Sequence, residues 1–225
     1  LLIGVFPSAS EADQAATEEI INLNEQISQS PNNAKAHYSL GQLYSRIGKD
    51  QKAIAEFKET VRIRPEYADV HHALGFSYSK LGKHEDAIAE FKESVRLKPD
   101  DADEHVSLGK AYQDAGKNQE AVGELKEAVR LKPNHADAHH KLGASYDNLG
   151  KYQEAIGEFK EAVRLKPDHG KAHVGLGGAY AKLDKYEEAA AEYKEALRIK
   201  PDDADPHYGM GVIYDKLGKH QDAAA

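Results

Sequence analysis

Apolar and small residues recur along most of the chain at the spacing of one helix face. In the segment that begins at Ala34 they fall at positions 37, 40, 41 and 44, and this i, i+3, i+4, i+7 pattern predicts a helix over residues 34–47. A second apolar series runs from Ala53 to Ile63 and predicts a second helix, which ends before Pro65 because proline cannot continue it. Gly48, between them, suits the left-handed residue that follows a helix end. The segment is therefore predicted to be a helix–turn–helix.

This pattern returns at a fixed interval along the chain, and four residue types mark it. Each marker lies 34 residues after the previous one of its kind: Pro31, Pro65, Pro99, Pro133, Pro167 and Pro201; Gly41, Gly75, Gly109, Gly143, Gly177 and Gly211; Tyr44, Tyr78, Tyr112, Tyr146, Tyr180 and Tyr214; His37, His71, His105, His139, His173 and His207. Four series that stay in phase over so long a stretch indicate an internal structural repeat.

Polar residues around each predicted helix pair agree with this reading. Glutamate precedes arginine by three residues on the second helix of five repeats, at Glu59–Arg62, Glu93–Arg96, Glu127–Arg130, Glu161–Arg164 and Glu195–Arg198. Such pairs stabilise a helix by roughly 0.2–0.5 kcal/mol each. Asp100-Asp101 and Asn134 follow the proline of their repeats and are expected to cap the next helix.

The repeat resembles the tetratricopeptide repeat. The residues that carry the resemblance are Leu74-Gly75, Tyr78, Ala87, Phe91 and Pro99, and the same set returns at Leu142-Gly143, Tyr146, Ala155, Phe159 and Pro167. Histidine stands throughout at the family's tryptophan position, Leu125 replaces the phenylalanine, and Asp184 replaces the turn glycine. The resemblance implies an all-α, right-handed superhelical solenoid of stacked helix–turn–helix units. It divides the chain into an N-terminal extension with an unpaired helix (1–33), five full units (34–203) and a partial sixth unit (204–225).

Composition and charge narrow the functional classes. Asp and Glu number 38 against 30 Lys and Arg, and the formal net charge of −8 argues against nucleic acid as a partner. The absence of cysteine excludes disulfides, zinc–thiolate sites and thiol nucleophiles. Successive histidines of the series are expected roughly 10 Å apart, as packed helices are, which is too far to share a metal ion. We therefore expect them to pack and to form hydrogen bonds between helices. No catalytic motif occurs, and we expect no enzyme activity, cofactor or transmembrane segment.

The resemblance also implies where a partner binds, because the first helices of such units line a concave groove. The expected function is a non-enzymatic scaffold that holds a peptide or protein there, and the scattered aromatic and acidic residues favour a basic or mixed peptide. The expected groove residues are Tyr38, Gln42, Asp69, His72, Phe76, Asp103, Val106, Lys110, Asp137, His140, Asp147 and Tyr208.

The two ends of the chain suggest an alternative function. Residues 17–30 have the pattern of a second helix without its first, and the chain stops early in the second helix of the sixth unit. A head-to-tail contact would rebuild one unit, and contacts of this kind form filaments when they do not close. The residues expected to mediate it are Leu1, Leu2, Ile3, Val5, Phe6, Ile20, Ile21, Leu23, Ile27, Tyr214 and Leu217. The apolar start with Ser8 and Ser10 is compatible with the end of a secretory signal, which favours a secreted or periplasmic location over a cytoplasmic one.

Overall fold

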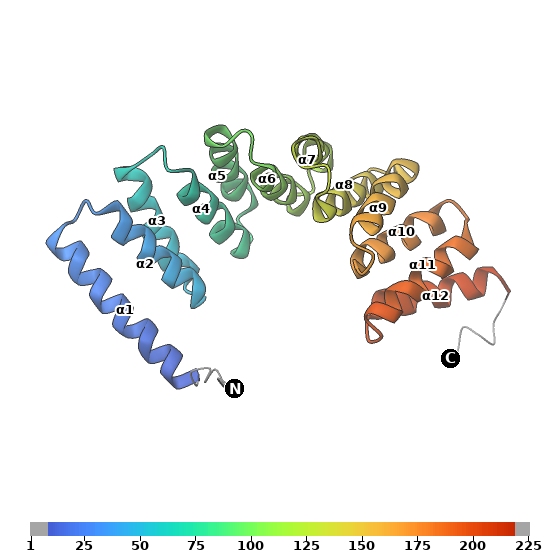
Figure 1. Cartoon of the computed structure of the whole chain (residues 1–225), viewed down its shortest axis with the longest axis horizontal. Coiled ribbons are helices and arrows are strands. Elements are labelled where there is room, and N and C mark those ends of the chain that lie inside the picture. The colour runs from blue at the N-terminus through green and yellow to red at the C-terminus, as the bar shows by residue number, and fades with distance from the viewer. Residues whose placement is uncertain (1–8, 219–225) are drawn as a thin grey trace, which may run out of the picture. The chain divides into compact units, whose positions relative to one another are not determined.

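The computed structural model describes residues 9–218, and within them every regular element is a helix (Figure 1). The chain forms two compact units, Leu1–Pro99 and Asp100–Ala225. The first contains α1 (Ala9–Gln29), α2 (Ala34–Arg46), α3 (Asp50–Ile63), α4 (Ala68–Lys80) and α5 (His84–Leu97). The second contains α6 (Ala102–Asp114), α7 (Asn118–Leu131), α8 (Ala136–Asn148), α9 (Tyr152–Leu165), α10 (Gly170–Lys182), α11 (Tyr186–Ile199) and α12 (Ala204–Lys216).

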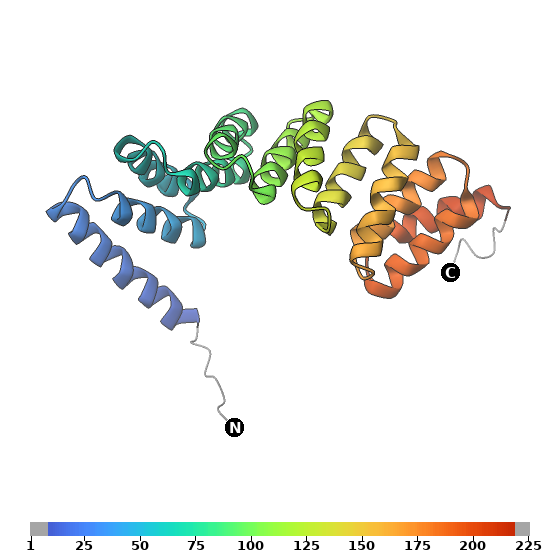
Figure 2. The same ribbon diagram turned by 45° about the horizontal axis from the view of Figure 1, so that its top comes forward.

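Within each unit consecutive helices pack against one another and short turns join them (Figures 1 and 2). The first helices of successive repeats also touch: α2 contacts α4 in the first unit, and α6, α8, α10 and α12 contact in series in the second. We call the exposed surface of these helices the first-helix face of each unit. The predicted all-α repeat architecture is confirmed. No helix among residues 9–218 is long and apolar enough to cross a membrane.

Helix ends follow the sequence signals with one exception. The turn glycines Gly48, Gly82, Gly116 and Gly150 all have positive φ, and Asp184 takes the same conformation with φ 57°. Asn33, Asp101 and Asp203 cap their helices through side-chain oxygens. The expectation for Asn134 is wrong, because the N-cap of α8 is His135, one residue later, and it makes no side-chain cap bond.

Each repeat is held together by one large side chain from its second helix. Phe159 of α9 is 2% exposed, and its ring lies directly against the backbone of Gly143 in α8 and of Gly175 in α10. Tyr193 of α11 lies in the same way against Gly177 and Gly209. A β-carbon on any of these glycines would come within 3 Å of the ring. These aromatic rings fix how closely the first helices approach and therefore shape the first-helix face.

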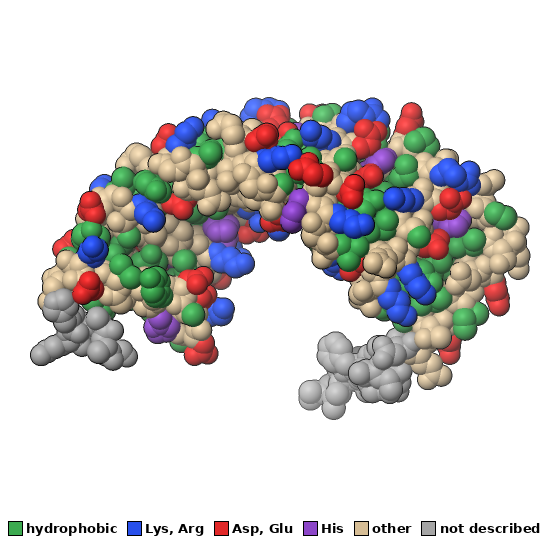
Figure 3. All heavy atoms as spheres, turned by 180° about the vertical axis from the view of Figure 1, so that it is seen from behind, with side chains coloured by type: hydrophobic (Ala, Val, Ile, Leu, Met, Phe, Trp, Pro, Cys, Tyr) green, Lys and Arg blue, Asp and Glu red, His purple; other side chains and the backbone are tan. Residues whose placement is uncertain are grey.

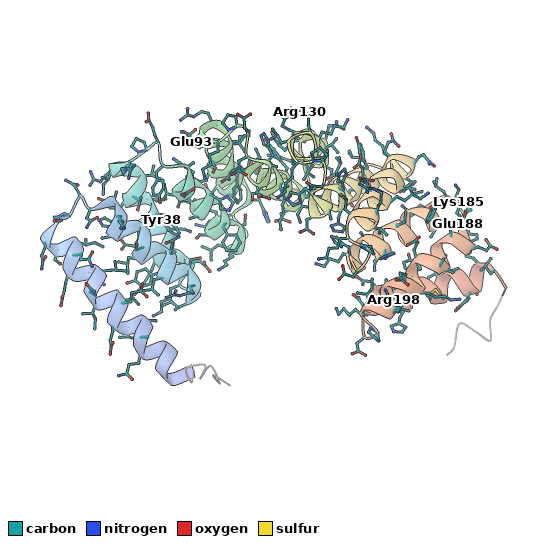
Figure 4. All side chains as sticks on the ribbon, viewed as in Figure 1. Tyr38, Glu93, Arg130, Lys185, Glu188 and Arg198 are labelled. Carbon is teal, nitrogen blue, oxygen red and sulfur yellow. The ribbon has the colours of Figure 1, made fainter. Side chains whose placement is uncertain are left out.

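The second helices present charge to the outside. The five predicted Glu–Arg pairs all form, and Figure 4 labels Glu93, Arg130 and Arg198, one member of each of three such pairs. Figure 3 shows acidic and basic side chains interspersed over one side of the molecule. Exposed pairs of this kind contribute little to stability, about 0–1 kcal/mol each.

Candidate partner-binding surface

Every groove residue predicted from the sequence lies on a first helix and keeps some exposed surface. Exposed members are Gln42, Phe76, Asp103, Lys110, Asp137 and Tyr208, and half-buried members are Tyr38, Asp69, His72, Val106, His140 and Asp147. Each unit groups its own members, so the two parts of the surface are described in turn.

In the first unit the first-helix face is aromatic. Tyr38, labelled on α2 in Figure 4, lies 5.0 Å from the ring of Tyr67 and 5.8 Å from that of Phe57. Burial, with Tyr67 and Asp69 nearby, raises the pKa of Tyr38 to about 12, so the hydroxyl stays protonated. The ring of His72 meets Phe91 edge-on at 5.4 Å. These rings form a packed floor rather than a loose surface.

Phe76 is the most exposed aromatic residue of this floor. Half of its surface is exposed, and the ammonium of Lys80 lies 5.0 Å from its ring centre. Lys80 also reaches the carboxylate of Asp50 at 3.4 Å, which helps to hold the ammonium in place. An exposed ring with a fixed cation beside it is a suitable contact for an apolar or aromatic side chain.

The aspartates at the start of the first helices are already paired within the protein. Asp69 accepts a hydrogen bond from Lys98 at 2.6 Å, Asp103 lies 2.8 Å from His135, and Asp137 lies 2.9 Å from His169. Each bond joins a first helix to the turn that leads from its own repeat into the next first helix. Sequence reasoning placed these three aspartates in the groove but missed this linking role.

His140 contributes an uncharged ring to the first-helix face of the second unit. Its ring centre lies 5.9 Å from Phe159 and 4.9 Å from His169. Burial, together with the nearby charges of His169 and Lys141, lowers the pKa of His140 to about 4. At neutral pH His140 therefore acts as a flat polar ring and not as a cation.

The second unit also contains a pocket of about 700 Å³ at its C-terminal repeats. Helices α10, α11 and α12 supply most of its walls, and Asp147 enters from the end of α8. Tyr193, Tyr208 and Val212 give it apolar surface, while Lys182, Lys216 and Asp205 bring charge. Asp147 is half-buried, and its Oδ1 accepts no hydrogen bond although it is shielded from solvent. Burial raises the pKa of this carboxyl, against an opposing effect of Lys182.

Comparison with known families agrees with this geometry. Sequence models described as tetratricopeptide repeat match residues 27–55, 106–167, 140–204 and 184–225, and one described as TPR repeat matches residues 44–82 and 77–116. Together they cover the chain from residue 27 to its last residue. The chain belongs to the tetratricopeptide repeat family. Proteins of this family are generally interaction scaffolds without catalytic activity, and the fold indicates protein partners.

Solved structures of other tetratricopeptide repeat proteins are similar to the chain. MamA protein is 28% identical, with a TM-score of 0.69, over 75% of this chain and 92% of that one. YrrB, described as a TPR protein with an unusual peptide-binding site, is 22% identical, with a TM-score of 0.70, over 83% and 96%. PilF of Pseudomonas aeruginosa is 20% identical, with a TM-score of 0.72, over 85% and 86%. No curated protein matches the chain. The structures of YrrB and PilF, which are less than 25% identical to the chain, show only that the fold is shared.

The histidines at the tryptophan position of these tetratricopeptide repeats join the two helices of each unit. Their Nδ1 atoms lie 2.7–2.8 Å from a glutamate on the second helix, in the pairs His37–Glu56, His71–Glu90, His105–Glu124, His139–Glu158 and His173–Glu192. The other nitrogen, Nε2, of His37, His71, His139 and His173 lies 2.9–3.1 Å from the carbonyl of the proline six residues earlier. The expected packing and hydrogen bonding between helices is confirmed. No group of side chains suited to a metal ion occurs in the described part of the chain.

Sequence reasoning missed the glutamates of these pairs. A signal was available, because Glu56, Glu90, Glu124, Glu158 and Glu192 also recur every 34 residues. Glutamate is common on exposed helix faces, however, so its recurrence did not by itself indicate a partner for histidine.

The predicted self-association residues fall into three groups. Leu1, Leu2, Ile3, Val5 and Phe6 lie outside the described residues. Ile20, Leu23 and Ile27 of α1 pack against α2, and Leu23 is 8% exposed, so these three stabilise the chain's own first repeat. Ile21 is 54% exposed on the same helix, and Tyr214 and Leu217 are half-buried at and just after the end of α12.

Proposed function

We propose that this tetratricopeptide repeat protein is an interaction scaffold that binds a peptide segment of a partner protein on its first-helix faces. The observation that carries the proposal is Phe76, a large aromatic side chain that remains half exposed above a packed aromatic floor. Rings of this kind are enriched at the centres of protein interfaces, where they supply much of the binding energy. The MamA and YrrB likenesses support the same architecture, and YrrB is a protein with a peptide-binding site.

The chemistry of the face favours a peptide with apolar and basic side chains. Tyr38 and His72 provide flat aromatic surface in the same unit, and His72 lies one helical turn before Phe76 on α4. Asp69, Asp103 and Asp137 are paired internally, whereas Asp147 and Asp205 remain on the first helices as contacts for a basic side chain. A solid floor also lowers the cost of binding, because few side chains need to be immobilised.

Selection of binders from a random peptide library displayed on phage, with the whole chain as bait, tests this function. We expect the selected peptides to lose affinity about tenfold or more on Phe76→Ala, since hot-spot aromatic residues contribute at least that much. Ile21→Ala is the matched control, because it truncates an apolar side chain of similar exposure on α1 (54% against 50%). Circular dichroism verifies that both variants keep their helices. Peptides that bind both variants as tightly as the parent would contradict the proposal.

Self-association is the second candidate function. The observation that favours it is Ile21, which is exposed on α1 while its neighbours Ile20 and Leu23 face α2. A second copy of the chain would cover this side chain. Light scattering coupled to size-exclusion chromatography should then report a mass above that of one chain, and Ile21→Asp should return it to 24.7 kDa. A parent chain that elutes as a monomer at all concentrations would exclude this function.

A further inference from the structure

The pocket of the C-terminal repeats exists because side chains are missing from one first helix. Gly178 of α10 lines it, and at the same position of the repeat the other first helices have Gln42, Phe76, Lys110, Ala144 and Val212. Gly175 and Gly209 also line it. At the equivalent position α8 has Lys141. The second helix before α8 carries Leu125 where the later second helices carry the larger Phe159 and Tyr193. The three glycines therefore leave space in these repeats that larger side chains occupy at the equivalent positions of other repeats.

Tyr193 forms part of the pocket wall between α10 and α12. Its hydroxyl oxygen lies 3.0 Å from where a β-carbon on Gly209 would stand and 3.7 Å from one on Gly178. The ring is 8% exposed and packs against the backbone of Gly209, and the absence of a side chain at Gly178 leaves room beside its hydroxyl end. The exposed ring of Tyr208, with 78% of its surface free, lies at the same pocket. The two rings provide surface for an alkyl chain.

Asp147 gives the pocket its chemical preference. One oxygen of this carboxylate is buried and accepts no hydrogen bond, which is costly for a charged group. Lys182 attracts the carboxylate but donates no hydrogen bond to that oxygen. Asp205 adds a second acidic group at the pocket, whereas Asp184 already accepts a hydrogen bond from the hydroxyl of Tyr186. A bound cation would compensate the carboxylate that the protein itself leaves without a donor.

We propose that this pocket holds one basic side chain, arginine or lysine, of the partner peptide, with its cationic end against Asp147 and its methylene groups along Tyr193 and Tyr208. Long basic side chains readily divide in this way between apolar and polar surroundings. Lys182 and Lys216 lie at the same pocket, and they would favour an acidic side chain instead. We favour the basic one because the buried oxygen without a donor belongs to an aspartate. This inference rests on the proposed function and specifies one contact within it.

Four short peptides test the inference. They are acetyl-Gly-Ser-Xaa-Ser-Gly-amide with Xaa as arginine, lysine, glutamine or glutamate, titrated into the whole chain labelled with ¹⁵N. We expect the arginine and lysine peptides to shift the amide resonances of Gly178, Ala181 and Gly209, and the glutamine and glutamate peptides to leave them in place. Asp147→Asn should weaken binding of the basic peptides by about tenfold, as expected for a charge-assisted hydrogen bond.

The repeat supplies a matched control. Asp215 occupies the position of Asp147 two repeats further on and does not line the pocket, so Asp215→Asn removes the same charge and should leave binding unchanged. The inference is overturned if Asp147→Asn binds the basic peptides as tightly as the parent, or if none of the peptides shifts these resonances. It is also overturned if the glutamate peptide binds and Lys182→Gln abolishes that binding. Library peptides that still require Phe76 after such a result would show that the proposed function stands without this contact.

Discussion

At the scale of the residue, the fold depends on pairs of glycines that receive one aromatic ring. Phe159 is enclosed between Gly143 and Gly175, so it cannot move away from one without approaching the other. Gly175 and Gly209 lie outside the glycine series of the repeat, and the sequence alone gives no reason for them. They are explained only when the ring of the preceding second helix is seen to lie against them.

This enclosure predicts opposite effects for two glycine substitutions. In Gly175→Ala the new β-carbon would come 2.6 Å from the ring of Phe159. Such overpacking costs about 1–3 kcal/mol of folding stability. This cost exceeds the gain in helix propensity from alanine, which is up to about 1 kcal/mol. In Gly157→Ala on α9 no atom lies within 4 Å of the new carbon, so the propensity gain remains. Urea denaturation should give a lower midpoint for the first variant and a higher one for the second. Equal midpoints would show that the ring is free to move.

At the scale of the element, one histidine joins the two helices of each repeat to the turn before them. His71 has Glu90 at one ring nitrogen and the carbonyl of Pro65 at the other. A carbonyl only accepts hydrogen bonds, so both nitrogens can donate together only when the ring is protonated. The hydrogen bond to Glu90 raises the pKa of His71 despite its burial, with support from the Pro65 carbonyl and the charges of Glu90 and Glu93.

This arrangement predicts that the contribution of His71 to stability falls as the pH rises. A raised pKa means that the folded chain binds the proton more tightly than the unfolded chain, whose histidine titrates near about 6.5. The stabilisation by His71 is complete below that value and is lost as the pH rises through the higher folded pKa. The difference in urea midpoint between the parent and His71→Gln should therefore decline from about pH 5.5 to about pH 8.5. This difference isolates His71 from His140, whose lowered pKa acts in the opposite sense. The difference between the parent and Glu90→Gln should decline in the same way, whereas that for His84→Gln, outside these pairs, should not. A difference that stays constant with pH for the first two variants would contradict this account.

The helices themselves were predictable from the sequence, and the reason is local. The first helix was expected over residues 34–47 and is found as α2, Ala34–Arg46, because apolar spacing, a turn glycine and a proline all act within a few residues. The partner of each histidine was not predictable in the same way. It lies 19 residues away on another helix, and its identity depends on which side of that helix faces inward. The pocket at Asp147 was harder still to predict, because it results from the side chains that Gly175 and Gly178 of α10 lack.

At the scale of the whole molecule, stability is built from contacts between neighbours in the chain. The helix contacts within each compact unit join elements that are adjacent or next-but-one in sequence. In such repeat proteins the free energy is approximately a sum of local terms for each repeat and its interfaces. A local defect should therefore loosen its own repeats first and leave distant repeats as they were.

Two variants that differ only in position test this expectation in the intact chain. In Gly41→Ala the new β-carbon would come 2.5 Å from the ring of Phe57, and in Gly175→Ala it would come 2.6 Å from that of Phe159. Hydrogen exchange followed by mass spectrometry should show faster exchange in α2–α4 for the first variant, with α10–α12 unchanged, and the reverse for the second. Each variant is thus the control for the other. Exchange that quickens equally in all helices would mean that the chain opens as one cooperative body, and the binding pocket at Asp147 would then depend on the stability of every repeat.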